Sequence, residues 1–417
     1  MNKENKNSKL SLKKALYFIG ISLCVLIVFL NLFILISGRF YLYKGIYYTY
    51  LHGKTAPGIF DKDVFYSSKI KKDPESISWK KSTRTKKISL TAKEIGDLES
   101  LQISSFLVFH EDTLLFEKYW GEHTQTSVSN SFSASKTVVA LLVGVALQEH
   151  AIKNLDEPVG NFIPAFKKGK KKEITIRHLL MMASGLDWEE SAKNPLSSNA
   201  ESYYGSNLYE LVCNQNVITK PGVLFNYQSG NSQLLGFIVE KATGKKLSDY
   251  AQEKLWSKMG TENDAYWSLD KKDGDEKSFC CLYSTSRDFA RIGKLIGNLG
   301  NWNGKQLVSR EYMIEILKNP KMKTKDGVPN YQYGLHIWTY LGGKYPVYYC
   351  RGILGQYIIS IPAKKLVIVR SGFKRMEDLK LTDEQKRDKQ FVKKNKFKIG
   401  QPSDLFQYIA IGERMIQ

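Results

Sequence analysis

The longest apolar run of the chain covers residues 15–38, which carry no charged side chain. A helix of that length spans the hydrocarbon core of a bilayer, which is about 30 Å thick. Two lysines precede the run and only Arg39 follows it closely, so the positive-inside rule predicts that residues 1–14 form a cytoplasmic tail. We therefore expect a single-pass anchor in the cell (inner) membrane and a periplasmic or otherwise extracytoplasmic domain. A cleaved signal peptide is the alternative, because small residues end the run, but its apolar region is normally shorter.

Beyond this anchor the hydrophobic pattern changes several times. Residues 39–95 are aromatic near the membrane and then polar and lysine-rich, which predicts a stalk and lead-in with little core of its own. Residues 104–119 hold two apolar segments around a polar turn, which predicts a β-hairpin. Strand character returns in residues 333–369, and helical patterns lie between. We predict one α+β domain over residues 96–417, with an antiparallel sheet built from both chain ends and flanked by helices.

One helix of this domain is predicted to be buried, because residues 137–147 carry apolar side chains around the whole circumference. Ser133 lies in the first turn of this helix. Lys136 lies one turn later on the same face, within reach of the serine oxygen. The pair is either a nucleophile with its base or an N-cap serine beside a lysine whose stem extends to solvent. This stretch alone leaves both readings open.

A second candidate side chain lies in a mostly helical region further along the chain. Tyr227 is followed by small polar residues and then by an amphipathic helix from Leu234 to Thr243. A tyrosine on such a turn can hold its hydroxyl rigidly, although it can equally be a core aromatic with a hydrogen-bonded tip.

The chain has a formal net charge of +21 and a pI near 9.4, mostly from lysine scattered along its length. It has no arginine-rich helix, zinc-ligand spacing or aromatic RNA-binding signature, so no nucleic-acid partner is expected. A basic exterior suits anionic lipid or cell-wall polymer better. The five cysteines contain no Cys-x-x-Cys pair, so neither metal nor thioredoxin chemistry is expected. A disulfide between distant cysteines remains open.

Five short motifs occur in one order along residues 100–375. They are Ser133-Ala-Ser-Lys136, Thr175-Ile-Arg-His-Leu-Leu with Ser184-Gly185-Leu186, Tyr227-Gln-Ser229-Gly-Asn231, Arg287-Asp288, and Gly352-Ile-Leu-Gly355-Gln356. This ordered set resembles the serine β-lactamase and penicillin-binding protein superfamily. Within it, the chain looks most like the class C branch and the 6-aminohexanoate-dimer hydrolase type of serine hydrolase. The resemblance implies a β-lactamase/transpeptidase-like fold.

The resemblance also implies roles for individual residues. Ser133 would be the nucleophile, Lys136 its base, and Tyr227 the general acid and base, with the choice of which group first takes the serine proton left open. The backbone N–H groups of Ser133 and Ile353 would hold the oxyanion. The residues expected to line the substrate pocket are Ser229, His336, Arg351, Gly352 and Gln356.

Two departures from the family pattern affect the expected substrate. The third motif is Cys350-Arg351-Gly352 instead of Lys-Thr-Gly, and the second is Tyr-x-Ser instead of Tyr-x-Asn. We therefore expect a membrane-anchored serine hydrolase that cleaves an ester or amide of a small molecule or peptide through an acyl-enzyme, with no metal or organic cofactor. The alternatives are a D,D-peptidase or β-lactamase, and a non-catalytic receptor that binds wall fragments.

Overall fold

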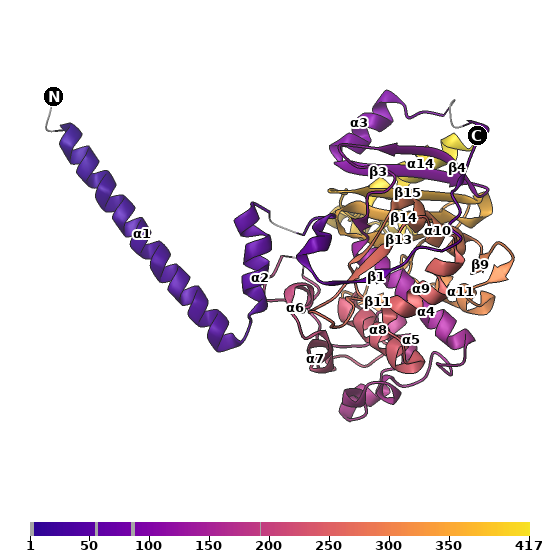
Figure 1. Cartoon of the computed structure of the whole chain (residues 1–417), viewed down its shortest axis with the longest axis horizontal. Helices are drawn as coiled ribbons and strands as arrows, with labels where there is room; N and C mark the ends of the chain where they lie inside the picture. Colours follow the sequence, from indigo (N-terminus) through magenta and orange to yellow (C-terminus); the bar gives the residue numbers. More distant parts are fainter. Residues whose placement is uncertain (1–3, 55–56, 85–87, 192) are drawn as a thin grey trace.

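The largest element of the computed structural model is a seven-stranded sheet with the order β12-β13-β14-β15-β3-β4-β2 (Figure 1). Its strands are β2 (Lys80–Lys81), β3 (Ile103–His110), β4 (Thr113–Tyr119), β12 (Trp338–Tyr340), β13 (Val347–Gly352), β14 (Gln356–Ile361) and β15 (Leu366–Gly372). The structure describes residues 4–54, 57–84, 88–191 and 193–417. Strand β15 pairs antiparallel with β3, which confirms the predicted antiparallel sheet built from both chain ends. Only the short edge strand β2 runs parallel to its neighbour, β4.

The hairpin predicted from residues 104–119 is confirmed as β3 and β4. Its two turn residues, Glu111 and Asp112, both have positive φ angles, 48° and 66°. A two-residue turn of this kind matches the right-handed twist of the flanking strands, and the short polar side chain of aspartate tolerates that backbone region.

Helices cover both faces of the sheet, which explains why its central strands are apolar on both sides. On one face, α3 (Ala92–Ser100) and α14 (Ser403–Met415) pack their buried leucine and tyrosine side chains on β3, β14 and β15. On the other face lies α10 (Ser286–Gly297), which separates the sheet from the helical region. The predicted α+β fold of the β-lactamase/transpeptidase type is thus present.

The helical region surrounds α4 (Ser135–Gln148), whose side chains from Ser135 to Ala146 are all buried. This burial agrees with the uniform apolar character of residues 137–147. The other helices of this region are α5 (Ile176–Leu180), α6 (Ser198–Tyr204), α7 (Leu208–Cys213), α8 (Ser229–Thr243), α9 (Leu247–Lys254) and α11 (Arg310–Leu317). Two short helices, α12 (Asp383–Arg387) and α13 (Lys389–Asn395), lie between β15 and α14 in the chain. The smaller strands are β1 (Ser67–Ile70), β5 (Ser129–Asn130), β6 (Leu224–Phe225), β7 (Ala265–Ser268), β8 (Leu282–Ser284), β9 (Asn301–Trp302), β10 (Lys305–Gln306) and β11 (Lys323–Thr324). Tyr227 lies just before α8, as its motif predicts.

Residues 39–95, predicted to be a stalk and lead-in with little core of their own, are packed on the domain in the structure. Strand β1 pairs with β7 along its whole length, and β2 extends the main sheet. Ile59, Ile70 and Trp79 are buried in the main core of the domain. The lysine-rich composition did not indicate this packing, because a few spaced apolar side chains are enough to hold an extended segment on a domain.

The chain begins with the long helix α1 (Glu4–Ser37), followed by the short helix α2 (Tyr41–Tyr48). Among the described residues, Lys13–Ser37 is the one segment long and apolar enough to cross a membrane, with a mean hydropathy of 3.0. Its length and composition suit a membrane span or a signal sequence.

Candidate active site

Ser133 lies at the junction between the sheet and the helical region, in a 3₁₀ turn (Phe132–Ala134) that leads directly into α4. The preceding residue, Phe132, has a positive φ of 44°, and its backbone N–H donates to Asn130 Oδ1 over 2.8 Å. A phenylalanine in this conformation is strained, so the surrounding contacts must hold it there. The turn leaves Ser133 only partly buried and directs it toward a cavity.

Lys136 is only 1% exposed and points along α4 to Ser133. Its Nζ donates to Ser133 Oγ over 3.0 Å, to Ser229 Oγ over 3.1 Å and to the Phe279 carbonyl over 2.7 Å. Burial lowers the pKa of Lys136 to about 8, and the negative charge of Glu190 opposes this shift. A lysine with such a pKa has a substantial neutral fraction near pH 8 and can accept a proton. The N-cap reading, with a lysine stem reaching solvent, does not describe this geometry.

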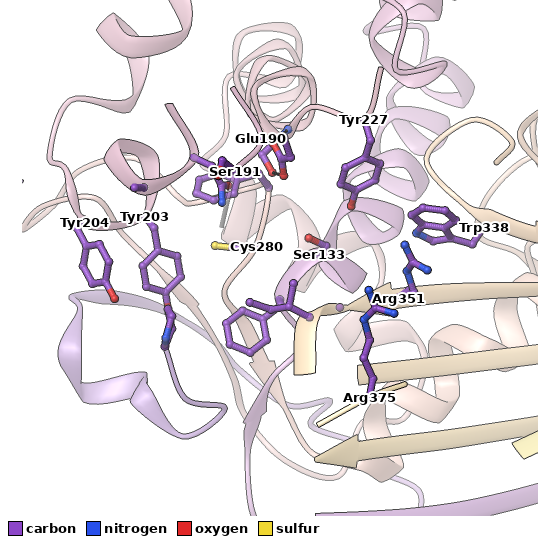
Figure 2. Close-up of a pocket in the computed structure, with 18 residues that line it drawn as sticks. Ser133, Glu190, Ser191, Tyr203, Tyr204, Tyr227, Cys280, Trp338, Arg351 and Arg375 are labelled. Carbon is purple, nitrogen blue, oxygen red and sulfur yellow. Dashed lines mark hydrogen bonds between the residues drawn. The ribbon is translucent and has the colours of Figure 1, made fainter. Parts of the chain in front are cut away.

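Tyr227 reaches the same point from the turn before α8. The Lys136 Nζ lies 5.3 Å from the centroid of the Tyr227 ring, and Figure 2 shows the tyrosine hydroxyl pointing toward Ser133. Burial and the Glu190 charge raise the pKa of Tyr227, while a hydrogen bond with Ser133 and the nearby Arg351 charge lower it. The net direction is upward, so the phenol keeps its proton and is suited to donate it.

The end of β13 forms the opposite wall of the site. A Cβ on Gly352 would lie 2.2 Å from the Ser131 carbonyl, so only glycine lets the strand approach the serine turn this closely. Ile353 follows, lines the cavity and is 42% exposed. Ser133 and Ile353 therefore line the same cavity.

Glu190 is a residue of the site that the sequence analysis missed. Its carboxylate accepts hydrogen bonds from the Ser229 hydroxyl over 2.6 Å, from the Ser229 backbone N–H over 2.7 Å and from Trp188 Nε1 over 2.8 Å. Ser229 in turn contacts Lys136, so a chain of contacts joins carboxylate, hydroxyl and amine. The sequence offered two adjacent glutamates, Glu189 and Glu190, in residues 187–220, a polar excursion without periodicity, so nothing in the pattern selects between them.

These groups border a cavity of about 340 Å³ (Figure 2). Aromatic side chains form much of its wall; they are Phe132, Tyr203, Tyr204, Tyr227, Phe279 and Trp338. Arg351 lines the cavity, with its guanidinium 3.8 Å from the centroid of the Trp338 ring. Arg351 and Arg375 both pair with Asp378, at 3.0 and 2.7 Å, so two positive charges share one carboxylate at this end.

Two residues predicted to line the pocket do not do so. His336 is 1% exposed; its Nδ1 donates to the Leu180 carbonyl over 2.9 Å, and its Nε2 accepts from Ser232 over 2.8 Å. Gln356 is also buried, and its amide donates to the Gly372 carbonyl over 2.7 Å and to the Ile353 carbonyl over 3.2 Å. The strand pattern could place these residues near the site but could not tell which face each side chain takes.

A disulfide joins the adjacent residues Cys280 and Cys281 at the cavity wall. Cys280 directly follows Phe279, whose carbonyl accepts a hydrogen bond from Lys136.

Within the described part of the chain, no group of three or more His, Cys, Asp or Glu side chains is placed to hold a metal ion.

A partly exposed serine hydroxyl, a buried amine of lowered pKa and a phenol of raised pKa thus meet at the edge of one cavity. The fold and this constellation define a protein of the β-lactamase/transpeptidase-like class. The chain belongs to the Beta-lactamase family, whose model matches residues 99–385.

Comparison with individual proteins agrees with this assignment. The chain is 24% identical to the 6-aminohexanoate-dimer hydrolase of Paenarthrobacter ureafaciens over 53% of this chain and 58% of that protein. It is 27% identical to the teichoic acid D-alanine hydrolase of Staphylococcus aureus over 39% of this chain and 36% of that protein. A solved structure from Bacillus anthracis, provisionally assigned as a 6-aminohexanoate-dimer hydrolase, superimposes with a TM-score of 0.66 at 19% identity, covering 84% of this chain and 89% of that one. The family is one of hydrolases.

Proposed function

We propose that this protein is a serine hydrolase that cleaves an ester or amide through an acyl-enzyme on Ser133. The observation that carries the proposal is the 3.0 Å contact between the Ser133 hydroxyl and the buried Lys136 amine at the mouth of a cavity. A serine hydroxyl is a weak nucleophile unless a base takes its proton during attack. A buried lysine with a pKa near 8 is such a base.

In the first step, neutral Lys136 takes the proton of Ser133 as Oγ bonds to the substrate carbonyl carbon. The negative charge that develops on the carbonyl oxygen would be stabilised by the backbone N–H groups of Ser133 and Ile353. Tyr227 then gives its proton to the leaving alcohol or amine as the carbonyl–leaving group bond breaks, and regains a proton from Lys136. Water hydrolyses the acyl-enzyme by the reverse order of proton transfers.

Arg351 of the third motif and Arg375 beside it favour a different substrate from that of a cell-wall peptidase. Arg351 stacks on Trp338 and shares Asp378 with Arg375, so its charge is partly neutralised before any substrate binds. In the Lys-Thr-Gly motif of the family, a lysine meets the substrate carboxylate. In this protein a guanidinium that is stacked on a tryptophan and paired with an aspartate lies at that motif instead. The aromatic cavity wall supplies apolar contact instead. These features support an esterase or amidase over β-lactam turnover.

We also propose that residues 15–38 anchor the protein in the membrane, with the catalytic domain outside the cytoplasm. Support comes from the apolar helix and from the positive charges that precede it.

The test is covalent labelling. A fluorophosphonate should label the wild-type protein and not Ser133→Ala, and wild type should turn over a panel of esters and amides at least 10³-fold faster than that variant. Ser135→Ala, which removes a fully buried hydroxyl two residues along the chain, is the matched control and should label normally. Penicillin labelling without ester or amide turnover would reverse the substrate assignment, and no labelling at all would refute the enzyme.

A further inference from the structure

The segment that follows the apolar helix is docked on the wall of the active-site cavity. Arg39 Nη1 donates to the Leu196 carbonyl over 3.0 Å, and the Tyr41 hydroxyl donates to the Pro195 carbonyl over 3.0 Å. Arg39 also lies 3.7 Å from the Glu201 carboxylate. These contacts tie α2 to the polar excursion that contains α6.

Apolar packing reinforces the same contact. Ile34, in the last turn of α1, is fully buried, and Tyr41 and Leu42 of α2 are 8% exposed each. They form a small core of their own, against which Ala200 and Tyr204 of α6 pack. Figure 1 shows α2 lying between the end of α1 and α6. The junction between span and domain is therefore a packed interface rather than a free linker.

Helix α6 separates this interface from the cavity. Its residues Asn199, Ala200, Tyr203 and Tyr204 line the cavity that contains Ser133. The wall between the junction and the cavity is therefore one helix thick, about 10 Å. The span is also close to the junction, because only residues 38–40 connect α1 to α2 and three residues reach about 10 Å at most.

The outer surface of the junction is aromatic. Phe40, Tyr43, Tyr47 and Tyr50 are between 40% and 66% exposed, and Leu51 is 71% exposed. Tyrosine and other aromatic rings concentrate where a membrane-spanning helix leaves the hydrocarbon. This belt continues directly from the span, so it fits the headgroup region of the same leaflet.

We propose that the active site is held at the membrane surface and acts on an ester or amide carried by a membrane-anchored amphiphile, with the reacting bond in the headgroup region. This inference rests on the proposed hydrolase function and on the proposed membrane anchor. The guanidinium groups of Arg351 and Arg375, which share the Asp378 carboxylate, line the cavity and complement an anionic headgroup. A domain on a flexible stalk could reach substrates in the cell wall, away from the membrane, whereas a domain docked against its anchor stays at the membrane surface.

The experiment uses the full chain in vesicles of phosphatidylglycerol and phosphatidylethanolamine. One fluorogenic ester is offered in three forms: soluble, attached to phosphatidylethanolamine by a short linker, and attached by a linker of about 40 Å. Wild type should hydrolyse the short-linker lipid at least 10-fold faster than the soluble ester at equal total concentration, and no slower than the long-linker lipid.

The decisive variant separates docking from anchoring. Twenty glycine and serine residues inserted between Gly38 and Arg39 keep the anchor but let the domain leave the surface. Turnover of the short-linker lipid should then fall at least 5-fold, the long-linker lipid should recover it, and the soluble ester should be unchanged. The same insertion at Gly304, in the exposed turn between β9 and β10, is the control and should change none of the three rates.

Three outcomes would overturn the inference: preference of wild type for the long-linker lipid, equal loss of all substrates after the insertion at Gly38, or no loss of any. Absence of soluble-ester turnover that depends on Ser133 would instead refute the proposed function, so the two failures are distinguishable.

Discussion

Replacing Glu190 by glutamine tests the electrostatic part of the site. The substitution removes a negative charge but keeps the size of the side chain and an oxygen that can accept from Ser229. The contacts of 3.1 Å from Lys136 to Ser229 and 2.6 Å from Ser229 to Glu190 place amine and carboxylate within about 6 Å of each other. The carboxylate stabilises the protonated lysine, so its loss should lower the pKa of Lys136 below the present value of about 8.

The size of this effect follows from the separation. Two unit charges about 6 Å apart interact by about 2.8 kcal/mol at an effective dielectric constant of about 20, which corresponds to about 2 pKa units. Glu190 is partly exposed, and water therefore screens some of this interaction. We expect a fall in the pKa of Lys136 of about 1 to 2 units.

The assay is kcat/KM for ester hydrolysis as a function of pH. If neutral Lys136 is the base, activity of the wild type rises with pH through about 8, where the lysine loses its proton. In Glu190→Gln this acid limb should move to lower pH by about 1 to 2 units, even if the maximal rate falls because Ser229 is held less firmly. Glu190→Asp keeps the charge and should shift the limb less, and Glu189→Gln, at the exposed neighbouring residue, should not shift it.

An unchanged limb in Glu190→Gln, or a limb that moves to higher pH, would refute this reasoning. Either result would mean that the group whose deprotonation controls the rate is not the amine next to Ser133.

Three further predictions concern the strand, the cation and the buried histidine. Gly352→Ala places a Cβ 2.2 Å from a backbone oxygen of the serine turn and should lower kcat/KM at least 10²-fold in a protein that still folds, as judged by circular dichroism; Gly96→Ala, with nothing within 4 Å of the new carbon, should leave the rate unchanged. Arg351→Gln should raise KM for esters with an anionic leaving group about 10-fold and leave neutral esters nearly unchanged; equal effects on both would contradict a charge-recognition role. Burial lowers the pKa of His336 to about 3, so above pH 6.5 the histidine is neutral in both the folded and the unfolded chain and does not affect stability. As the pH falls from 6.5 toward 3, the histidine of the unfolded chain binds a proton and that of the folded chain does not, so the folded state loses stability. Urea unfolding at pH 7 and 5 should therefore show about 2 kcal/mol more acid destabilisation in wild type than in His336→Gln, and an equal loss in both would count against a neutral, structural histidine.

Local signals in the sequence accounted for much of the site. The uniform apolar surface of residues 137–147 requires burial, and the three-residue spacing in a helix brings Lys136 to Ser133. Gly352 was expected at the substrate pocket, and the structure places it there, against the serine turn. These features follow from backbone geometry, which depends on neighbours in the chain.

The contributions of Glu190 and of residues 39–95 could not be obtained in this way. Glu190 belongs to an excursion without periodicity, and its contacts to Ser229 span 39 positions of sequence. Residues 39–95 read as polar linker, yet they supply β1 and the junction helix α2. In both cases a few side chains act through partners that only the fold brings near.

What the sequence determined by itself was thus the buried helix, the sheet drawn from both chain ends, and the serine, lysine and tyrosine motifs, because each depends on residue types at short spacing. The tertiary structure alone decided which carboxylate faces the lysine, which way Arg351, His336 and Gln356 point, and how close the apolar helix lies to the cavity. The physical reason is that charge interactions and packing depend on distances through space, and these are fixed only when segments far apart in the chain are folded against one another.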